Sequence, residues 1–331
     1  MSDGNVTTHT NHRPDGKALV IATRGSPLAL AQTEMVRALL MRRNAGLAID
    51  KLSIRTTGDR FLDISLATMG GKGLFTKELD EALLAGRADL AVHSMKDVPT
   101  KPTDGLVIAA VLEREDPRDV FIAHEGGGPK DLPSGARVGT SSLRRGAQIR
   151  HARPDVSIVP FRGNVETRLR KMREGEADAT LLALAGLRRL GLADARGGYA
   201  GGVTLTTDEM LPAPAQGAIG IVCRENDETM RAMLEAISHR PTAIAVTAER
   251  AALAALDGSC RTPIAALATL AGDSLALRVA IFTPDGSRLL DTSRSGAAAD
   301  AASLGHDAGA ELRERGGPDF FTAADAAKGS G

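Results

Sequence analysis

The chain has 331 residues, of which 43% are hydrophobic, so it is long and apolar enough to bury cores in two or three domains. Its 41 acidic residues balance its 41 basic residues, so any basic cluster is local, which excludes a generally basic nucleic-acid binder. Aromatic residues make up only 2%, too few for the base-stacking platforms of single-stranded nucleic acid. No apolar run approaches the roughly 18 residues of a membrane span. From the charge balance, the aromatic content and this missing span, we expect neither nucleic acid nor a membrane as a partner.

The sequence up to about residue 238, roughly the first two thirds of the chain, predicts alternating strands and helices. Residues 1–16 are polar and lack an apolar run, so we expect a disordered tail and no secretory or transit peptide. From about residue 18 to 238, short apolar runs alternate with helical periodicity, which is typical of βαβ units and a mostly parallel sheet. A strand at 19–23 precedes Ser26 as N-cap and Pro27 in the first turn of a helix. Further strands are expected at 89–93, 137–139 (the end of a strand), 156–161, 179–183 and 219–223.

Changes in the pattern indicate how the chain divides into domains. Segments rich in proline and glycine near 116–117 and 211–217 predict crossings between two lobes. After residue 240, a helix at 243–256, a loop at 257–260, two strands joined at 284–287 and a helix at 301–315 are typical of a small α+β domain. We expect two α/β lobes with a cleft between them: domain 1 at 17–115 and 212–236, domain 2 at 116–211, domain 3 at 237–318, and a frayed tail at 319–331.

Polar residues gather where the predicted strands end. The carboxyl ends of strands in an open α/β sheet border the ligand site, so the loops beginning at 24, 93, 140 and 162 should converge. Arginine forks, hydroxyls and free N–H groups at helix starts favour carboxylate or phosphate, although a solvated helix face would show the same residues. The residues concerned are Arg24, Ser26, Lys96, Thr140, Ser141, Ser142, Arg144, Arg145, Arg162 and Arg168.

Asp97 and Cys260 are the candidates for chemistry. Asp97 follows Lys96 and precedes Val98-Pro99, so its carboxylate, placed among cations, can stabilise a developing positive charge or pass a proton; the alternative is a charged pair on a turn. Cys260 precedes Arg261 on a loop, where a cation favours the nucleophilic thiolate; the alternative is an inert buried cysteine.

Other residue patterns are less informative. Two cysteines are too few for a disulfide framework and fit a reducing compartment, hence the cytoplasm. Cys223 lies in an apolar run and should be inert, and His93 is interpreted as a packed histidine at a strand end. The histidine and cysteine spacing gives no zinc motif, so no metal site is expected.

The glycine-rich stretch GGKGLF at 70–75 is not a Walker A motif, because a glycine follows its lysine. It favours a flexible lid whose Lys72 and Phe75 reach the cleft, against the alternative of an ordinary mobile loop. No strand is followed by the G-x-G-x-x-G pattern of a dinucleotide site.

Taken together, these segments resemble the porphobilinogen deaminase (hydroxymethylbilane synthase) family. The matching strings, in the family's order between about residues 18 and 265, are RGSPLAL at 24–30, GGKGLF at 70–75, HSMKDVP at 93–99, EREDPRD at 113–119, GTSSLRR at 139–145, RGNV at 162–165, AGLRRLGL at 185–192 and the Cys260 loop. The loop departs from the family in one residue, Ser259, where glycine is common. The match is least informative at the N-terminal tail and the alanine-rich C-terminus.

The resemblance implies two periplasmic-binding-protein-like α/β lobes and a small α+β C-terminal domain, forming a monomer. It implies a transferase that joins four porphobilinogen molecules head to tail, releases ammonia and yields hydroxymethylbilane. A dipyrromethane cofactor would be attached to Cys260 through a thioether, with Asp97 as the catalytic carboxylate. Implied cofactor-binding residues are Lys96, Asp97, Thr140, Ser141, Ser142, Arg144, Arg145 and Arg168; substrate-binding residues are Arg24, Ser26, Arg162, Arg168 and Arg189; lid residues are Lys72 and Phe75.

A second hypothesis is a two-lobed protein that closes on a small polyanion without catalysis, since an anion-binding cleft alone would suffice for that. Such a receptor has no need of a group tethered to a cysteine on a third domain.

Overall fold

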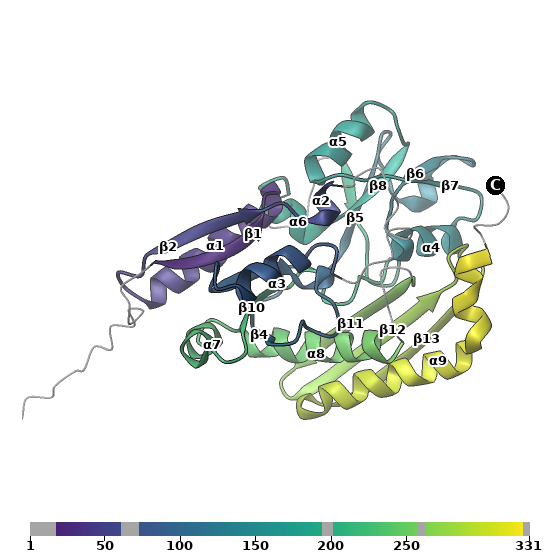
Figure 1. The fold of residues 1–331 in the computed structure, drawn as a ribbon. Helices are drawn as coiled ribbons and strands as arrows, with labels where there is room; N and C mark the ends of the chain where they lie inside the picture. The colour runs from purple at the N-terminus through teal and green to yellow at the C-terminus, as the bar shows by residue number, and fades with distance from the viewer. Residues whose placement is uncertain (1–17, 61–72, 194–200, 257–261, 327–331) are drawn as a thin grey trace, which may run out of the picture.

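A computed structural model describes residues 18–60, 73–193, 201–256 and 262–326. The expected tail at 1–16, Lys72 of the expected lid and Cys260 lie outside these described residues. The described chain forms three sheets, each with its own helices (Figure 1).

The first sheet builds one lobe and has five strands in the order β2 (Ile49–Ile54), β1 (Leu19–Arg24), β3 (Leu90–Ser94), β10 (Ile219–Arg224) and β4 (Leu106–Val111). Strands β2, β1 and β3 are parallel, and β10 is antiparallel to both of its neighbours. Helices α1 (Pro27–Arg43) and α7 (Glu228–Glu235) share a core with one face of this sheet, while α3 (Lys77–Leu84) packs on the other face. A single turn, α2 (Thr57–Arg60), precedes α3, and a 3-10 helix, η1 (Met95–Asp97), follows β3.

The second sheet repeats this plan strand for strand. Its order is β7 (Ser157–Val159), β6 (Arg137–Gly139), β8 (Ala179–Ala183), β5 (Asp119–Ala123) and β9 (Gly202–Thr204). The first three strands are parallel, and β5 is antiparallel to both neighbours, as β10 is in the first sheet. Helix α4 (Leu143–Ala152) covers one face, and α5 (Val165–Arg173) with α6 (Leu184–Arg189) covers the other. Because β10 returns to the first sheet after the second is complete, the chain crosses between the lobes twice.

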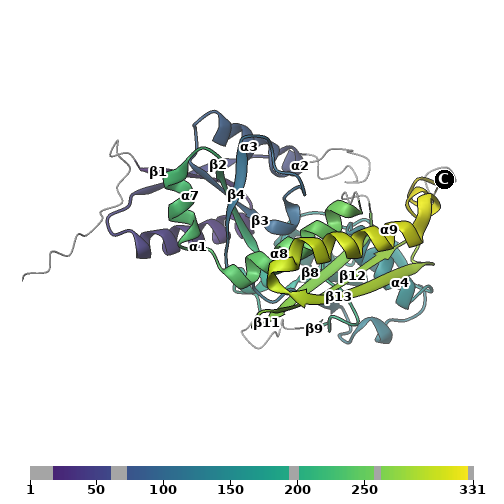
Figure 2. The ribbon, with the colours of Figure 1, turned by 90° about the horizontal axis from the view of Figure 1, so that it is seen from below.

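The third domain is an antiparallel sheet under two helices. Strands β11 (Ile264–Ala271), β12 (Ser274–Phe282) and β13 (Leu289–Ala297) pack against α8 (Arg240–Ala255) and α9 (Ala301–Ala326), which lie side by side (Figure 2). The two helices approach closely because α9 places glycines at the contact. A Cβ on Gly305 would lie 2.1 Å from the carbonyl oxygen of Ala248, so no larger residue fits there. Short 3-10 helices at η2 (Pro129–Asp131) and η3 (Ala298–Asp300) complete the described elements.

The expected fold class, two α/β lobes with a small α+β C-terminal domain, is confirmed. All six strands expected before residue 238 are present within a few residues of their expected limits, as are the two strands joined at 284–287. Helix α8 begins at Arg240, earlier than expected, because His239 caps it and a proline occupies its first turn. The domain boundaries themselves stay a prediction.

The expectation of a frayed tail at 319–331 is wrong for residues 319–326, which belong to α9. Helix α9 runs to Ala326, interrupted at Gly317, whose φ of 65° changes the direction of the chain. Beyond this break Phe320 is 1% exposed and joins the core of the third domain, with the guanidinium of Arg288 4.9 Å from its ring. One aromatic anchor therefore orders a segment whose alanine-rich composition suggested fraying.

We expect Phe320→Ala to lower the free energy of unfolding by about 3 kcal/mol, because it empties a buried aromatic site. Urea unfolding followed by circular dichroism measures this change, with Glu314→Ala, at an exposed position of the same helix, as the control. Equal stability of the two variants would show that the end of α9 does not dock.

Candidate active site

In the described ranges a helix or helical turn follows each parallel strand of the two lobes, and polar side chains cap α1, α4 and α5. The Ser26 hydroxyl accepts a hydrogen bond from the backbone N–H of Ala29 at the start of α1. Ser142 and Asn164 cap α4 and α5 in the same way. At the carboxyl ends of the strands, Arg24 ends β1, Asp97 ends η1 after β3, Arg145 lies in the first turn of α4 after β6, and Arg162 lies on the loop after β7. This is the edge where ligands bind in such sheets.

A buried carboxylate, Asp119, organises the arginines of the second lobe. It is fully buried at the start of β5, and its Oδ2 accepts from Nη2 of Arg144 at 2.7 Å while its Oδ1 accepts from Nη2 of Arg145 at 2.6 Å. Burial alone would raise the pKa of Asp119, but the charges and hydrogen bonds of both arginines outweigh it and hold this pKa well below its usual range. Asp119 is therefore an anion that fixes two guanidinium groups.

Gln216 joins this network to the first lobe. Its Nε2 donates to Oδ1 of Asp119 at 2.8 Å and to the carbonyl oxygen of Pro117 at 2.7 Å, and its Oε1 accepts from Nζ of Lys96 at 3.2 Å. Gln216 is 1% exposed and lies on the second crossing between the lobes. Lys96, which follows β3 of the first lobe, is thereby held beside the arginines of the second lobe.

Charged residues from three of the predicted loops influence one another's pKa. Loss of hydration, followed by the positive charge of Arg145, lowers the pKa of Lys96 to about 8, although Asp97 and Asp119 act in the opposite direction. The Lys96 side chain is nevertheless exposed to solvent. We therefore interpret its surroundings as an open recess, in which many protein atoms lie near the ammonium group. Burial and the charges of Arg145 and Arg162 lower the pKa of Arg168 to about 10, opposed by Asp97.

The resulting cluster carries an excess of positive charge. It contains two carboxylates, Asp97 and Asp119, and five cations: Lys96, Arg144, Arg145, Arg162 and Arg168. Arg168 donates through Nε to the carbonyl oxygen of Gly163, and its two Nη groups bond to no acceptor in the described ranges. A ligand with several carboxylates would relieve this repulsion and occupy those donors. The residues present therefore fit a polycarboxylate.

The hydroxyls of the loop at 140–142 are used within the protein. Oγ1 of Thr140 accepts from the backbone N–H of Ser142, and Oγ of Ser141 accepts from that of Phe161, which ties this loop to the one that carries Arg162. Arg144 and Arg145 are each 5% exposed and also donate to the carbonyl oxygens of Leu211 and Leu181. Direct contact of these residues with a ligand stays a prediction.

Arg24 lies on the first lobe beside aromatic and histidine side chains. Its guanidinium stands 4.2 Å from the ring centroid of Phe75, and burial together with the charge of Arg24 lowers the pKa of His93 to about 4. His93 is 5% exposed, so it is a packed neutral histidine, as interpreted from its position in the sequence. Phe75, the described residue of the predicted lid, therefore contacts a residue expected to bind substrate.

Arg189 contacts the second crossing, next to Gln216. Its Nη2 donates to the carbonyl oxygen of Gly217 at 2.6 Å, and burial lowers its pKa to about 10. The neighbouring Arg188 pairs with Glu115 at 2.6 Å. Both arginines thus fasten α6 to the crossing segments, and contact of Arg189 with substrate stays a prediction.

Sequence reasoning did not identify Asp119 or Gln216 as site residues. The sequence does contain a signal for Asp119, which is the single charged residue at the start of an otherwise apolar strand. Burying a charge without partners costs much free energy, so such a residue is expected to have cationic partners. Gln216 offers no comparable signal, since a glutamine in a proline-rich loop is ordinary.

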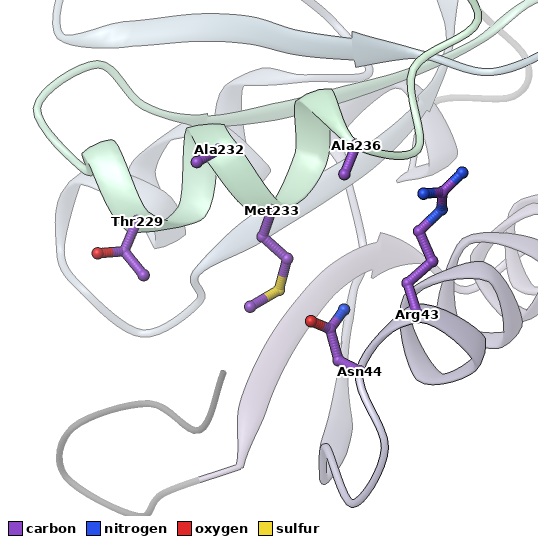
Figure 3. A pocket seen from close by; sticks show the side chains of 6 residues that line it. All are labelled: Arg43, Asn44, Thr229, Ala232, Met233 and Ala236. Atoms are coloured by element: carbon purple, nitrogen blue, oxygen red, sulfur yellow. The ribbon is translucent and has the colours of Figure 1, made fainter. Parts of the chain in front are cut away.

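A separate hollow of about 520 Å³ lies between the end of α1 and α7 (Figure 3). It is lined by Arg43, Asn44, Thr229, Ala232, Met233 and Ala236. Helix α1 has 17 residues, so this end lies about 25 Å from the Ser26 cap at the other end. The hollow is therefore not part of the cationic cluster.

Comparison with known proteins identifies the family. A family model described as "Porphobilinogen deaminase, dipyromethane cofactor binding domain" matches residues 19–232, and one described as "Porphobilinogen deaminase, C-terminal domain" matches residues 243–314. The chain belongs to the porphobilinogen deaminase family. It is 55% identical over 304 residues to porphobilinogen deaminase of Nitrobacter winogradskyi, covering 91% of this chain and 95% of that protein. It is 50% identical over 308 residues to the chloroplastic porphobilinogen deaminase of Oryza sativa subsp. japonica, covering 91% and 85%.

Among solved structures, the VFT2 domain of BvgS from Bordetella pertussis aligns with a TM-score of 0.39 and 16% identity, covering 67% of this chain and 86% of that domain. The expected family is confirmed, and with it the transferase and its dipyrromethane cofactor; the alternative of a polyanion receptor has no support. Within the described ranges, no helix has the length and apolar character to cross a membrane.

We expect Asp119→Asn to lower the free energy of unfolding by about 3 to 5 kcal/mol, because it leaves two buried guanidinium charges without their carboxylate. The matched control is Asp208→Asn, which removes an exposed pair with Arg278 and should cost less than about 1 kcal/mol. Urea unfolding compares the two, and equal losses would mean that Asp119 does not organise this lobe.

Proposed function

We propose that this chain condenses four porphobilinogen molecules head to tail, with release of ammonia, to give hydroxymethylbilane, and that it does so around Asp97 with the dipyrromethane cofactor attached to Cys260. The observation that carries the assignment of the site is the excess of cations around Asp97 in a chain of this family.

The cationic cluster would hold the carboxylates of the growing chain. Each pyrrole unit carries two carboxylates, so a two-ring cofactor brings four. Lys96 and Arg168 have donors available for them, while Arg144 and Arg145 add positive potential from fixed positions behind the site. We assign the loop hydroxyls of Thr140, Ser141 and Ser142 to the same cofactor. Incoming substrate would be bound by Arg24, Ser26, Arg162, Arg168 and Arg189, with Lys72 and Phe75 on the lid.

Asp97 would act on the charge that develops as ammonia leaves. When the aminomethyl C–N bond of porphobilinogen breaks, nitrogen departs with the bonding pair and the remaining methylene pyrrole becomes positively charged. A carboxylate beside the pyrrole nitrogen stabilises that charge, whereas the surrounding arginines would repel it. The bound cofactor would supply the pyrrole carbon to which the first unit is joined, and each later unit would be joined to the free pyrrole carbon of the unit before it; that carbon loses its proton as the new C–C bond forms. Asp97 thus provides the negative charge in a site otherwise built for anions.

The thiol assigned to the cofactor is Cys260 rather than Cys223. Cys223 is fully buried in β10, and burial raises its pKa to about 11, so it remains a protonated thiol at neutral pH. Cys260 follows α8 on the third domain, next to Arg261 in the sequence.

We also propose that the enzyme acts as a cytoplasmic monomer without nucleic-acid or membrane partners. The equal numbers of acidic and basic residues and the small number of cysteines support this proposal.

Intact-protein mass spectrometry tests the cofactor assignment. We expect the purified protein to carry the added mass of two pyrrole units, Cys260→Ala to lack it, and Cys223→Ala to retain it. An unmodified protein that still consumes porphobilinogen would overturn the assignment.

Asp97→Asn should keep the two pyrrole units but lose nearly all turnover, because the amide preserves shape without the charge. Mass spectrometry and a porphobilinogen consumption assay measure the two properties on one sample. Wild-type turnover in this variant would remove Asp97 from the mechanism, and loss of the pyrrole units would mean that its charge is needed to retain the cofactor.

A further inference from the structure

The position of Asp97 depends on its backbone. In the part of the chain that the structure describes, no group donates a hydrogen bond to the Asp97 carboxylate, so no described side chain fixes it directly. Asp97 ends η1, after which Val98 is extended and Pro99 lacks an N–H group. The carbonyl groups that follow Asp97 therefore need partners outside a regular element.

Arg250 of α8 supplies those partners. Its Nη1 donates to the carbonyl oxygen of Val98 at 2.9 Å, and its Nη2 donates to those of Pro99 at 2.6 Å and Thr100 at 3.1 Å. One planar guanidinium thus holds three consecutive carbonyls directly after Asp97. Such a fork defines the path of a backbone more tightly than a single donor can.

The same face of α8 packs against both sides of the Lys96-Asp97 pair. Val246, one helical turn before Arg250, shares a buried cluster with Met95 and Val98. Next to Arg250, Glu249 is fully buried, pairs with Arg114, and accepts from the backbone N–H groups of Ala215 and Ala268. Helix α8 is therefore fixed to the crossing segment, to the third sheet and to the Asp97 loop at once.

We infer that Arg250 is a positioning residue for the reaction, which sets the place of Asp97 relative to the third domain. This inference rests on the proposed function, because it assigns Arg250 a role through Asp97. Helix α8 ends at Ala255, a few residues before Cys260, so one rigid helix connects the catalytic loop with the segment that carries the proposed tether. Arg250 itself contacts backbone and has no part in binding substrate carboxylates.

The test replaces Arg250 in the holoenzyme by methionine, which keeps an apolar stem, and by lysine, which keeps the charge and some donors. We expect Arg250→Met to lower kcat by about 10-fold to 100-fold, the scale of a displacement of about 1 Å. KM for porphobilinogen should stay within about twofold, because the substrate contacts are elsewhere. Arg250→Lys should have an intermediate kcat. Mass spectrometry should show that both variants retain the two pyrrole units. The control is Arg240→Met, at the exposed start of α8.

A double-mutant cycle with Asp97→Glu separates positioning from a general structural effect. If Arg250 acts through Asp97, the loss caused by Arg250→Met is smaller in the Asp97→Glu background; an additive loss overturns the inference. Turnover of Arg250→Met equal to that of Arg240→Met also overturns it, as does loss of the pyrrole units in both Arg250 variants. If Arg250→Met does not fold, a folded Arg250→Lys with wild-type kcat overturns it instead. Failure of the proposed function is distinct, since wild-type protein would then lack the pyrrole units or the turnover.

Discussion

The fully buried carboxylate of Asp119 is the constraint on which the site depends. Two arginines from the start of α4 and one glutamine from the crossing segment converge on its two oxygens. Without Asp119, the guanidinium groups of Arg144 and Arg145 would be two buried charges of the same sign, side by side. With it, they have fixed positions, and Gln216 extends the same network to Lys96 across the lobes. The cost of burying these charges is offset only while the whole network is intact.

The repeated topology of the two lobes explains why this network lies where it does. Each lobe places parallel strands in the same order, so each presents its polar loops at one edge. The antiparallel strands β5 and β10 each follow a crossing between the lobes, and the residues at those crossings, Asp119 and Gln216, bond to each other. The third domain contacts both lobes. Arg250 reaches the loop after Asp97, and Arg150 and His151 of α4 bond to carbonyl oxygens of Pro284 and Gly286 in the turn before β13.

Much of this arrangement could be predicted from the sequence, because periodicity and caps are local signals. The strands that end at Arg24 and Gly139 and the cap at Ser26 follow from apolar runs and from the residues next to them. The grouping of Lys96, Asp97, Arg145 and Arg168 also followed from strand ends. The hydrogen-bond partners of the arginines could not be predicted in this way, because the pairing of Asp119 with Arg144 joins residues that are distant in the sequence. The order of residues 319–326 was missed because one buried ring, Phe320, outweighs a composition that suggests disorder.

The central claim is that cations fixed by Asp119 hold a polycarboxylate with Asp97 at its pyrrole nitrogens. A crystal structure of the purified holoprotein tests this most directly. The account predicts that Lys96 and Arg168 donate to the cofactor carboxylates, that Arg144 and Arg145 keep their bonds to Asp119, and that the Asp97 carboxylate lies within hydrogen-bond distance of the pyrrole N–H groups. A cofactor whose carboxylates face solvent, or whose pyrrole nitrogens face away from Asp97, would contradict it.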